Sequence, residues 1–163
     1  KHLILIRHAK AEYGYLDDDF NRNLTKTGME ESKIIANQIL LKKIIPDLII
    51  SSGANRALHT SKIISKIIRY SKDIKVDNNI FEANYNDLLN IIKNIDDSIN
   101  TLMITGHNPS LCDLTKYLSK KNIYTFPTCT MVSISFETKT WLFLEKEKLN
   151  FLIYPDLFKW LIQ

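Results

Sequence analysis

Two arginines and two histidines stand at or just after the ends of short apolar segments in this 163-residue chain. Arg7 and His8 follow LILI, Arg56 follows LIISSGAN, and His107 follows LMITG. Arginine offers a planar fork of donors that fits phosphate oxygens and keeps its charge. A neutral imidazole has one nitrogen with a free lone pair, which can attack phosphorus. The quartet therefore predicts phosphoryl chemistry.

The same residues suggest how the nucleophile would be kept ready. Flanking arginines oppose protonation of an imidazole, so we expect Arg7 and Arg56 to lower the pKa of His8. We also expect the other ring nitrogen of His8 to bind a backbone group, which would fix the tautomer. Phosphoryl transfer then depends mostly on positioning and on charge stabilisation.

The hydrophobic pattern predicts the elements that must position these side chains. Apolar runs at 3–6, 46–51 and 102–105 are typical of strands buried on both faces. Residues 9–26, including the acidic run Asp17–Asp19, are predicted to form a solvated loop. We expect helices at 27–43, 56–70, 85–95 and 111–118, strands at 74–76 and 131–136, and a last hairpin pair from 143–144 and 149–154.

The order of these elements predicts an α/β fold. Alternating strands and helices indicate a three-layer α/β/α sandwich with a mostly parallel central sheet, in one domain over residues 1–163. The first long helix would begin at a cap from Thr25 or Thr27, with Glu30 as the capping-box partner of Thr27. Ligands of such sheets bind at the carboxyl ends of the strands. The quartet is therefore expected to converge there.

Composition and missing motifs exclude several function classes. The chain is 45% hydrophobic and 25% charged, with a net charge of +4, and lacks a basic block with interleaved aromatics typical of nucleic-acid binding. No apolar run is long enough to span a membrane. The sequence begins at Lys1 and lacks a signal-peptide pattern there, so we expect a cytoplasmic protein.

Metal and nucleotide sites are not expected either. The four glycines are too far apart for GxGxxG or GxxxxGK, and HExxH is absent. Cys112 and Cys129 form no CxxC pair, and neither is followed by arginine six residues later, as a cysteine-dependent phosphatase requires. We therefore predict no metal and no cofactor.

Five segments together resemble the histidine phosphatase superfamily, and more narrowly its small SixA-type phosphohistidine phosphatases. The Arg-His pair alone is a weak signal, but RH, SSxxxR and GHN in this order after three strands is a specific one. The resemblance runs from about Leu3 to Tyr154. The segments are LIRHAKAE, NRNLTKTG, SSGANRALHT, ITGHNPSL and FPTCTMVSISF.

The resemblance implies a phosphoglycerate-mutase-like fold and a role for each site residue. His8 would be the nucleophile, and Arg7, Arg56 and His107 would form the phosphate pocket. Arg22 matches the arginine of the family's RPLT segment, which also reaches the phosphate, although Asn23 replaces the proline. Asn108 would hold the pocket rim. Arg22 could instead only pair with the acidic run. Gly53 also replaces a usual proline, which predicts a looser turn before Arg56.

The identity of an acid separates the candidate substrates. Larger relatives that cleave phosphate esters protonate the leaving oxygen, and Glu82 is the candidate here. SixA-like members do without such an acid, because an imidazole can leave with its own proton. The leading hypothesis is a phosphatase of phosphohistidine on a partner protein. The alternatives are a phosphatase of small phosphate esters and a non-catalytic domain that binds phosphoproteins. No sequence feature indicates an oligomeric state.

Overall fold

The computed structural model describes residues 1–14, 16–144 and 147–161, without the side chains of 16–17 and 159–161. One six-stranded sheet, in the order β3-β2-β4-β1-β5-β6, forms its centre. The first four strands in this order run parallel, and β5 and β6 are antiparallel to their neighbours. The strands are β1 (His2–Arg7), β2 (Leu48–Ser51), β3 (Lys75–Val76), β4 (Thr101–Gly106), β5 (Met131–Phe136) and β6 (Glu147–Ile153). The predicted mostly parallel sheet is confirmed.

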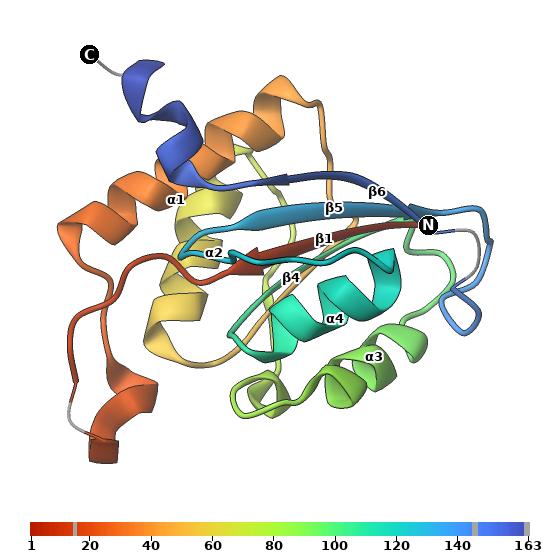
Figure 1. Ribbon diagram of the computed structural model, residues 1–163, viewed down its shortest axis with the longest axis horizontal. Helices are drawn as coiled ribbons and strands as arrows, with labels where there is room; N and C mark the ends of the chain where they lie inside the picture. Colours follow the sequence, from red (N-terminus) through yellow and green to blue (C-terminus); the bar gives the residue numbers. More distant parts are fainter. Residues whose placement is uncertain (15, 145–146, 162–163) are drawn as a thin grey trace.

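Helices cover both faces of this sheet, as predicted for a three-layer sandwich (Figure 1). Leu3 and Leu5 of β1 face one core cluster, which also takes the buried residues of α3 and α4. Ile4 and Ile6 face the other cluster, with α1 and α2. The alternation follows from the two-residue period of a strand. The helices are α1 (Lys26–Leu41), α2 (Asn55–Ile67), α3 (Tyr85–Lys93) and α4 (Ser110–Ser119), with 3-10 turns η1 (Leu16–Asn21), η2 (Asn78–Ile80) and η3 (Pro155–Leu161).

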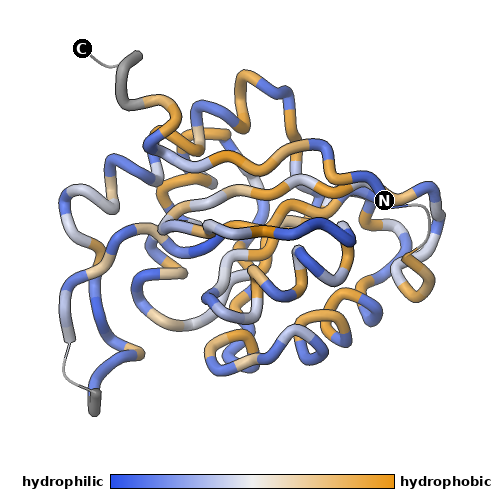
Figure 2. Tube along the Cα trace, viewed as in Figure 1, coloured by the Kyte–Doolittle hydropathy of each residue, from blue (hydrophilic) through white to orange (hydrophobic). Residues whose placement is uncertain are grey.

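Polar and apolar residues separate in the way this layering requires. Hydrophobic segments run through the central strands, whereas the connection from β1 to α1 is mostly hydrophilic (Figure 2). Within the described residues, no helix combines the length and apolar character needed to cross a membrane.

Helix α1 begins at a cap that the sequence predicted as one of two alternatives. The Thr25 side chain accepts a hydrogen bond from the Gly28 amide at 3.0 Å, so the helix begins at Lys26. The predicted capping box of Thr27 and Glu30 does not form. Glu30 instead makes an ion pair with Lys33 at 2.6 Å.

Two predicted segments differ from the structure. Residues 9–26 contain the 3-10 turn η1 and a bridge between Ala11 and Leu24, so the prediction of a plain loop was wrong. The last hairpin pairs β6 with β5, not with residues 143–144, because β5 presents an edge six residues long. Phe143 is largely exposed, and residues 145–146 lie outside the described part of the chain.

Gly28 allows α1 to approach the chain that follows His8. A Cβ atom at Gly28 would lie 2.0 Å from the carbonyl oxygen of Lys10. Gly28→Ala is therefore expected to lower the free energy of unfolding by about 1–3 kcal/mol through overpacking, although alanine is the better helix former. Urea unfolding would measure this, with the exposed Asn37→Ala in the same helix as the control. Equal stability of Gly28→Ala and wild type would contradict the close contact.

Candidate functional site

Three neighbouring strands bring the site together. Strands β2, β4 and β1 are adjacent and parallel, so their carboxyl ends meet at one edge of the sheet. His8 follows β1, Ser52 follows β2 and His107 follows β4. The His8 amide still binds the carbonyl of Gly106 at 3.0 Å, which continues the β1–β4 pairing. The rings of His8 and His107 lie 5.2 Å apart, centroid to centroid.

The two ring nitrogens of His8 have different partners. Nδ1 lies 2.8 Å from the carbonyl oxygen of Ala9, which can only accept, so Nδ1 carries the proton. Arg56 Nε donates to Nε2 at 3.2 Å, so Nε2 presents a lone pair. Burial, aided by the positive charges of Arg56 and Arg7, lowers the pKa of His8 to about 4. The backbone bond and the lowered pKa agree with what the sequence predicted.

A closed circuit of hydrogen bonds passes through both His8 nitrogens. The Ala9 amide donates to Thr60 Oγ1 at 3.0 Å, and Thr60 Oγ1 donates to the Arg56 carbonyl at 2.7 Å. Arg56 Nε donates to His8 Nε2, which completes the circuit. Thr60 is fully buried and was missed in the sequence, although its position four residues after Arg56 puts both on one helix face.

Asp19 bridges two of the three arginines that the resemblance assigned to phosphate. Its Oδ2 lies 2.7 Å from Arg56 Nη2 and its Oδ1 lies 2.7 Å from Arg22 Nη1. Arg22 therefore does pair with the acidic run, the alternative that the sequence left open. Hydrogen bonds from Arg22, and then from Arg56, lower the pKa of Asp19. The solvated-loop interpretation missed the contact of Asp19 with Arg56, although the Asp19 side chain stays 41% exposed. Asp18 is exposed and binds Asn21.

His107 is held by the residue that follows β2. Its Nε2 lies 2.8 Å from Ser52 Oγ, and Ser52 Oγ also accepts from the Ala54 amide at 3.3 Å. Burial, followed by the neighbouring His8 and Arg56, lowers the pKa of His107 to about 3. The ring of Phe81 meets the ring of His107 edge-on, with centroids 5.4 Å apart. Ser52 could have been found from its place at a strand end.

Arg7 and Asn108 share one backbone partner. Arg7 Nη1 and Asn108 Nδ2 donate to the carbonyl of Phe126, at 2.8 and 3.1 Å. Arg7 Nε, Asn108 Oδ1 and His107 Nδ1 are buried and have no hydrogen-bond partner among the described residues. Buried polar atoms of this kind require an explanation, and a polar ligand at this site supplies one.

Glu82 lies apart from these groups. It is exposed and lines a hollow of about 440 Å³ together with Phe81, whose ring also contacts His107. The structure therefore brings His8, Arg56 and His107 together and leaves Glu82 outside. A Cβ at Gly53 would meet Asn78 Oδ1 at 2.0 Å, so the glycine leaves room for the Asn78 side chain. The looser turn expected there stays a prediction.

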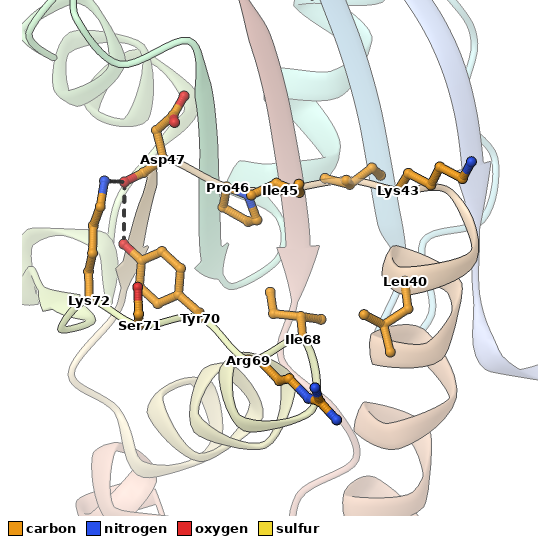
Figure 3. Close-up of a pocket in the computed structure, with 11 residues that line it drawn as sticks. Leu40, Lys43, Ile45, Pro46, Asp47, Ile68, Arg69, Tyr70, Ser71 and Lys72 are labelled. Carbon is orange, nitrogen blue, oxygen red and sulfur yellow. Dashed lines mark hydrogen bonds between the residues drawn. The ribbon is translucent and has the colours of Figure 1, made fainter.

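A larger cavity, about 560 Å³, lies at the opposite end of the sheet (Figure 3). It is bounded by the residues that follow α1 and α2 and by Pro46 and Asp47, just before β2. The Asp47 carboxylate binds the backbone amides of Asn100 and Thr101, at 2.9 and 2.8 Å. The lining contains neither histidine nor cysteine. The candidate for chemistry is therefore the cluster at the carboxyl ends of the strands.

Comparison with models of known families identifies the family of this chain. The family model of the histidine phosphatase superfamily (branch 1) matches residues 3–108, which include His8, Arg56 and His107. The chain belongs to the histidine phosphatase superfamily. A sequence search of curated proteins finds no significant match.

Solved structures of other phosphatases share the fold. A protein assigned as phosphohistidine phosphatase SixA from Agrobacterium tumefaciens is 24% identical, with a TM-score of 0.82 over 94% of this chain and 97% of that one. The protein histidine phosphatase SixA complexed with tungstate is 18% identical, with a TM-score of 0.84 over 98% and 100%. A mycobacterial glucosyl-3-phosphoglycerate phosphatase is 13% identical, with a TM-score of 0.63 over 92% and 97%. The phosphoglycerate-mutase-like fold predicted from the sequence is thereby confirmed.

Proposed function

We propose that this histidine phosphatase removes the phosphoryl group from phosphohistidine on a partner protein, through a phosphohistidine formed on His8. The observation that carries the proposal is the state of His8. Nδ1 donates to the Ala9 carbonyl, and Nε2 presents its lone pair beside Arg56. A neutral imidazole fixed in this way is a competent nucleophile for phosphorus.

The reaction would proceed in two displacements. The hydrogen bond from Arg56 Nε to His8 Nε2 breaks, and Arg56 Nε binds a phosphoryl oxygen instead. His8 Nε2 then forms a bond to phosphorus while the bond from phosphorus to the substrate imidazole breaks, and that imidazole leaves with a proton on its ring. Water then attacks phospho-His8, the P–Nε2 bond breaks, and inorganic phosphate is released. Arg7, Arg22 and Arg56 would bind the phosphoryl oxygens and stabilise the charge of both transition states.

His107 would act as a neutral hydrogen-bond donor. Because Ser52 Oγ accepts from the Ala54 amide, its own proton is free to bind His107 Nε2. That tautomer leaves the proton on Nδ1, which is buried and has no hydrogen-bond partner in the described part of the chain. Such a donor suits a phosphoryl oxygen, and Asn108 would hold the rim through the Phe126 carbonyl.

The carboxylates near the site support phosphohistidine over a phosphate ester. An alkoxide leaving group needs an acid, whereas an imidazole can leave with its own proton. Asp19 is held ionised by two arginines, so it is unsuited to donate a proton. Glu82, the acid that the sequence suggested, is exposed, and only its neighbour Phe81 contacts His107.

Phosphate release from two substrates tests the proposal. The wild-type protein is expected to release phosphate rapidly from a phosphohistidine-bearing protein and slowly from p-nitrophenyl phosphate. Glu82→Gln should leave both rates unchanged. Faster release from the ester, together with a loss in Glu82→Gln, would instead identify a phosphatase of small esters.

The protonation state of His8 can be measured without a substrate. Because the folded pKa lies near 4, below the ordinary 6.5 of histidine, the ring should stay neutral at pH 6 and become charged only as the pH falls through about 4. A ¹⁵N NMR titration would follow its Nδ1 and Nε2 signals, which are assigned by their loss in His8→Ala. Protonation of His8 near pH 6.5 would contradict the burial and charge argument.

A further inference from the structure

Asp19 offers three acceptor atoms to two arginines. Its carboxylate oxygens bind Arg22 Nη1 and Arg56 Nη2, each at 2.7 Å, and its backbone carbonyl accepts from Arg56 Nη1. The Arg56 side chain is only 6% exposed, so its charge is nearly removed from water and needs a partner. The contact links η1 to the first turn of α2.

These contacts leave one edge of Arg56 facing the nucleophile. Its two terminal nitrogens bind Asp19, while Nε points to His8 Nε2. Arg22 is also held by two contacts: its Nη1 donates to Asp19, and its Nε donates to the Glu12 carbonyl at 2.6 Å. An incoming phosphoryl group could therefore bind Arg56 Nε, the nitrogen that faces His8, without displacing the Asp19 carboxylate.

Neighbouring contacts fix where Asp19 stands. Asn55, which precedes Arg56, donates from Nδ2 to the carbonyl of Asn21 at 2.8 Å and to Asn23 Oδ1 at 3.3 Å. Two successive residues of α2 thus hold the same short segment. The carboxylate lies between the guanidinium groups of Arg22 and Arg56. The positive charges of Arg7 and Arg22 both act on Arg56, and the carboxylate offsets this repulsion.

We infer that Asp19 is a positioning residue that holds Arg22 and Arg56 in the orientation needed for phosphoryl transfer at His8. The inference rests on the proposed function. Without the carboxylate, the terminal nitrogens of Arg56 would lose their partner, and the guanidinium would no longer be held in one orientation. The rate of phosphoryl transfer would then fall, because only donors fixed in place stabilise the charge of the transition state fully.

Steady-state kinetics with a phosphohistidine-bearing protein tests this role. Asp19→Ala is expected to lower kcat about tenfold or more, the scale of a lost charged orienting contact, and Asp19→Asn, which keeps one acceptor oxygen, should lose less. Asp18→Ala is the matched control, because it removes the same charge from the same turn at a residue that binds Asn21. A kcat of Asp19→Ala at or above that of wild type would overturn the inference and identify the carboxylate as a stand-in that substrate displaces.

A double-mutant cycle and an NMR signal complete the test. Once Arg22 is replaced by alanine, Asp19→Ala should cost much less than in the wild type, because the two act together. The Arg56 Nε–H signal, bonded to His8, should lose protection from exchange in Asp19→Ala and keep it in Asp18→Ala. An unchanged signal in Asp19→Ala would overturn the inference. Failure of the wild type to release phosphate would contradict only the proposed function, because the signal requires no substrate.

Discussion

His8→Ala is expected to abolish phosphate release, with a loss of about 10⁴-fold or more in kcat, because the proposed covalent intermediate forms on His8. His8 Nε2 carries a lone pair at the carboxyl ends of β1, β2 and β4, whereas His107 Nε2 is bound to Ser52. The remaining arginines would still bind the phosphoryl group but could not cleave its bond. Phosphate release from a phosphohistidine-bearing protein measures the loss.

Detection of the intermediate gives this prediction a second readout. Acid-labile, alkali-stable radioactivity should appear on the wild-type protein after rapid quenching of a labelled substrate, and should be absent from His8→Ala. His2→Ala is a suitable control, since His2 lies at the other end of β1 and binds Ser133. Turnover of phospho-His8 would also exclude a domain that only binds phosphoproteins. Near-normal release by His8→Ala would remove His8 from the mechanism.

The sequence predicted the parts of the site that lie on regular elements. Apolar runs defined three buried strands, and the carboxyl ends of neighbouring parallel strands must meet, so the approach of His8 and His107 followed from pattern alone. Arg56 could be included because it lies one residue into a helix that starts close to the end of β2. Local periodicity is sufficient for such residues.

The parts of the site and fold that the sequence did not predict depend on contacts between distant segments. Asp19 meets Arg56 across 37 residues, and the fold of η1 around it is fixed by α2 rather than by a local pattern. Thr60 looked like an ordinary helix residue until Ala9 was seen to bind it. The partner of β6 was mistaken for the same reason, because a strand pattern gives the faces of a strand and not its neighbour.

Arg56→Ala is expected to lower kcat/KM about 10²–10³-fold, because a fixed donor beside the reacting atoms is lost from a buried site. Arg56→Lys should recover little of this. A lysine carries the charge on a single ammonium group, which cannot hold the terminal contacts to Asp19 and the inner contact to His8 at the same time. The comparison therefore separates the shape of the guanidinium from its charge.

The control for Arg56 lies just beyond the other end of the same helix. Arg69 is exposed beside the cavity that follows α2, so Arg69→Lys should leave kcat/KM unchanged (Figure 3). Thermal unfolding of each variant should accompany the kinetics, because Arg56 also ties η1 to α2. If folded Arg56→Lys matches wild type, the fork geometry is irrelevant and only a positive charge is needed. If it falls nearly as far as Arg56→Ala, the directed donors of Arg56 are what phosphoryl transfer requires.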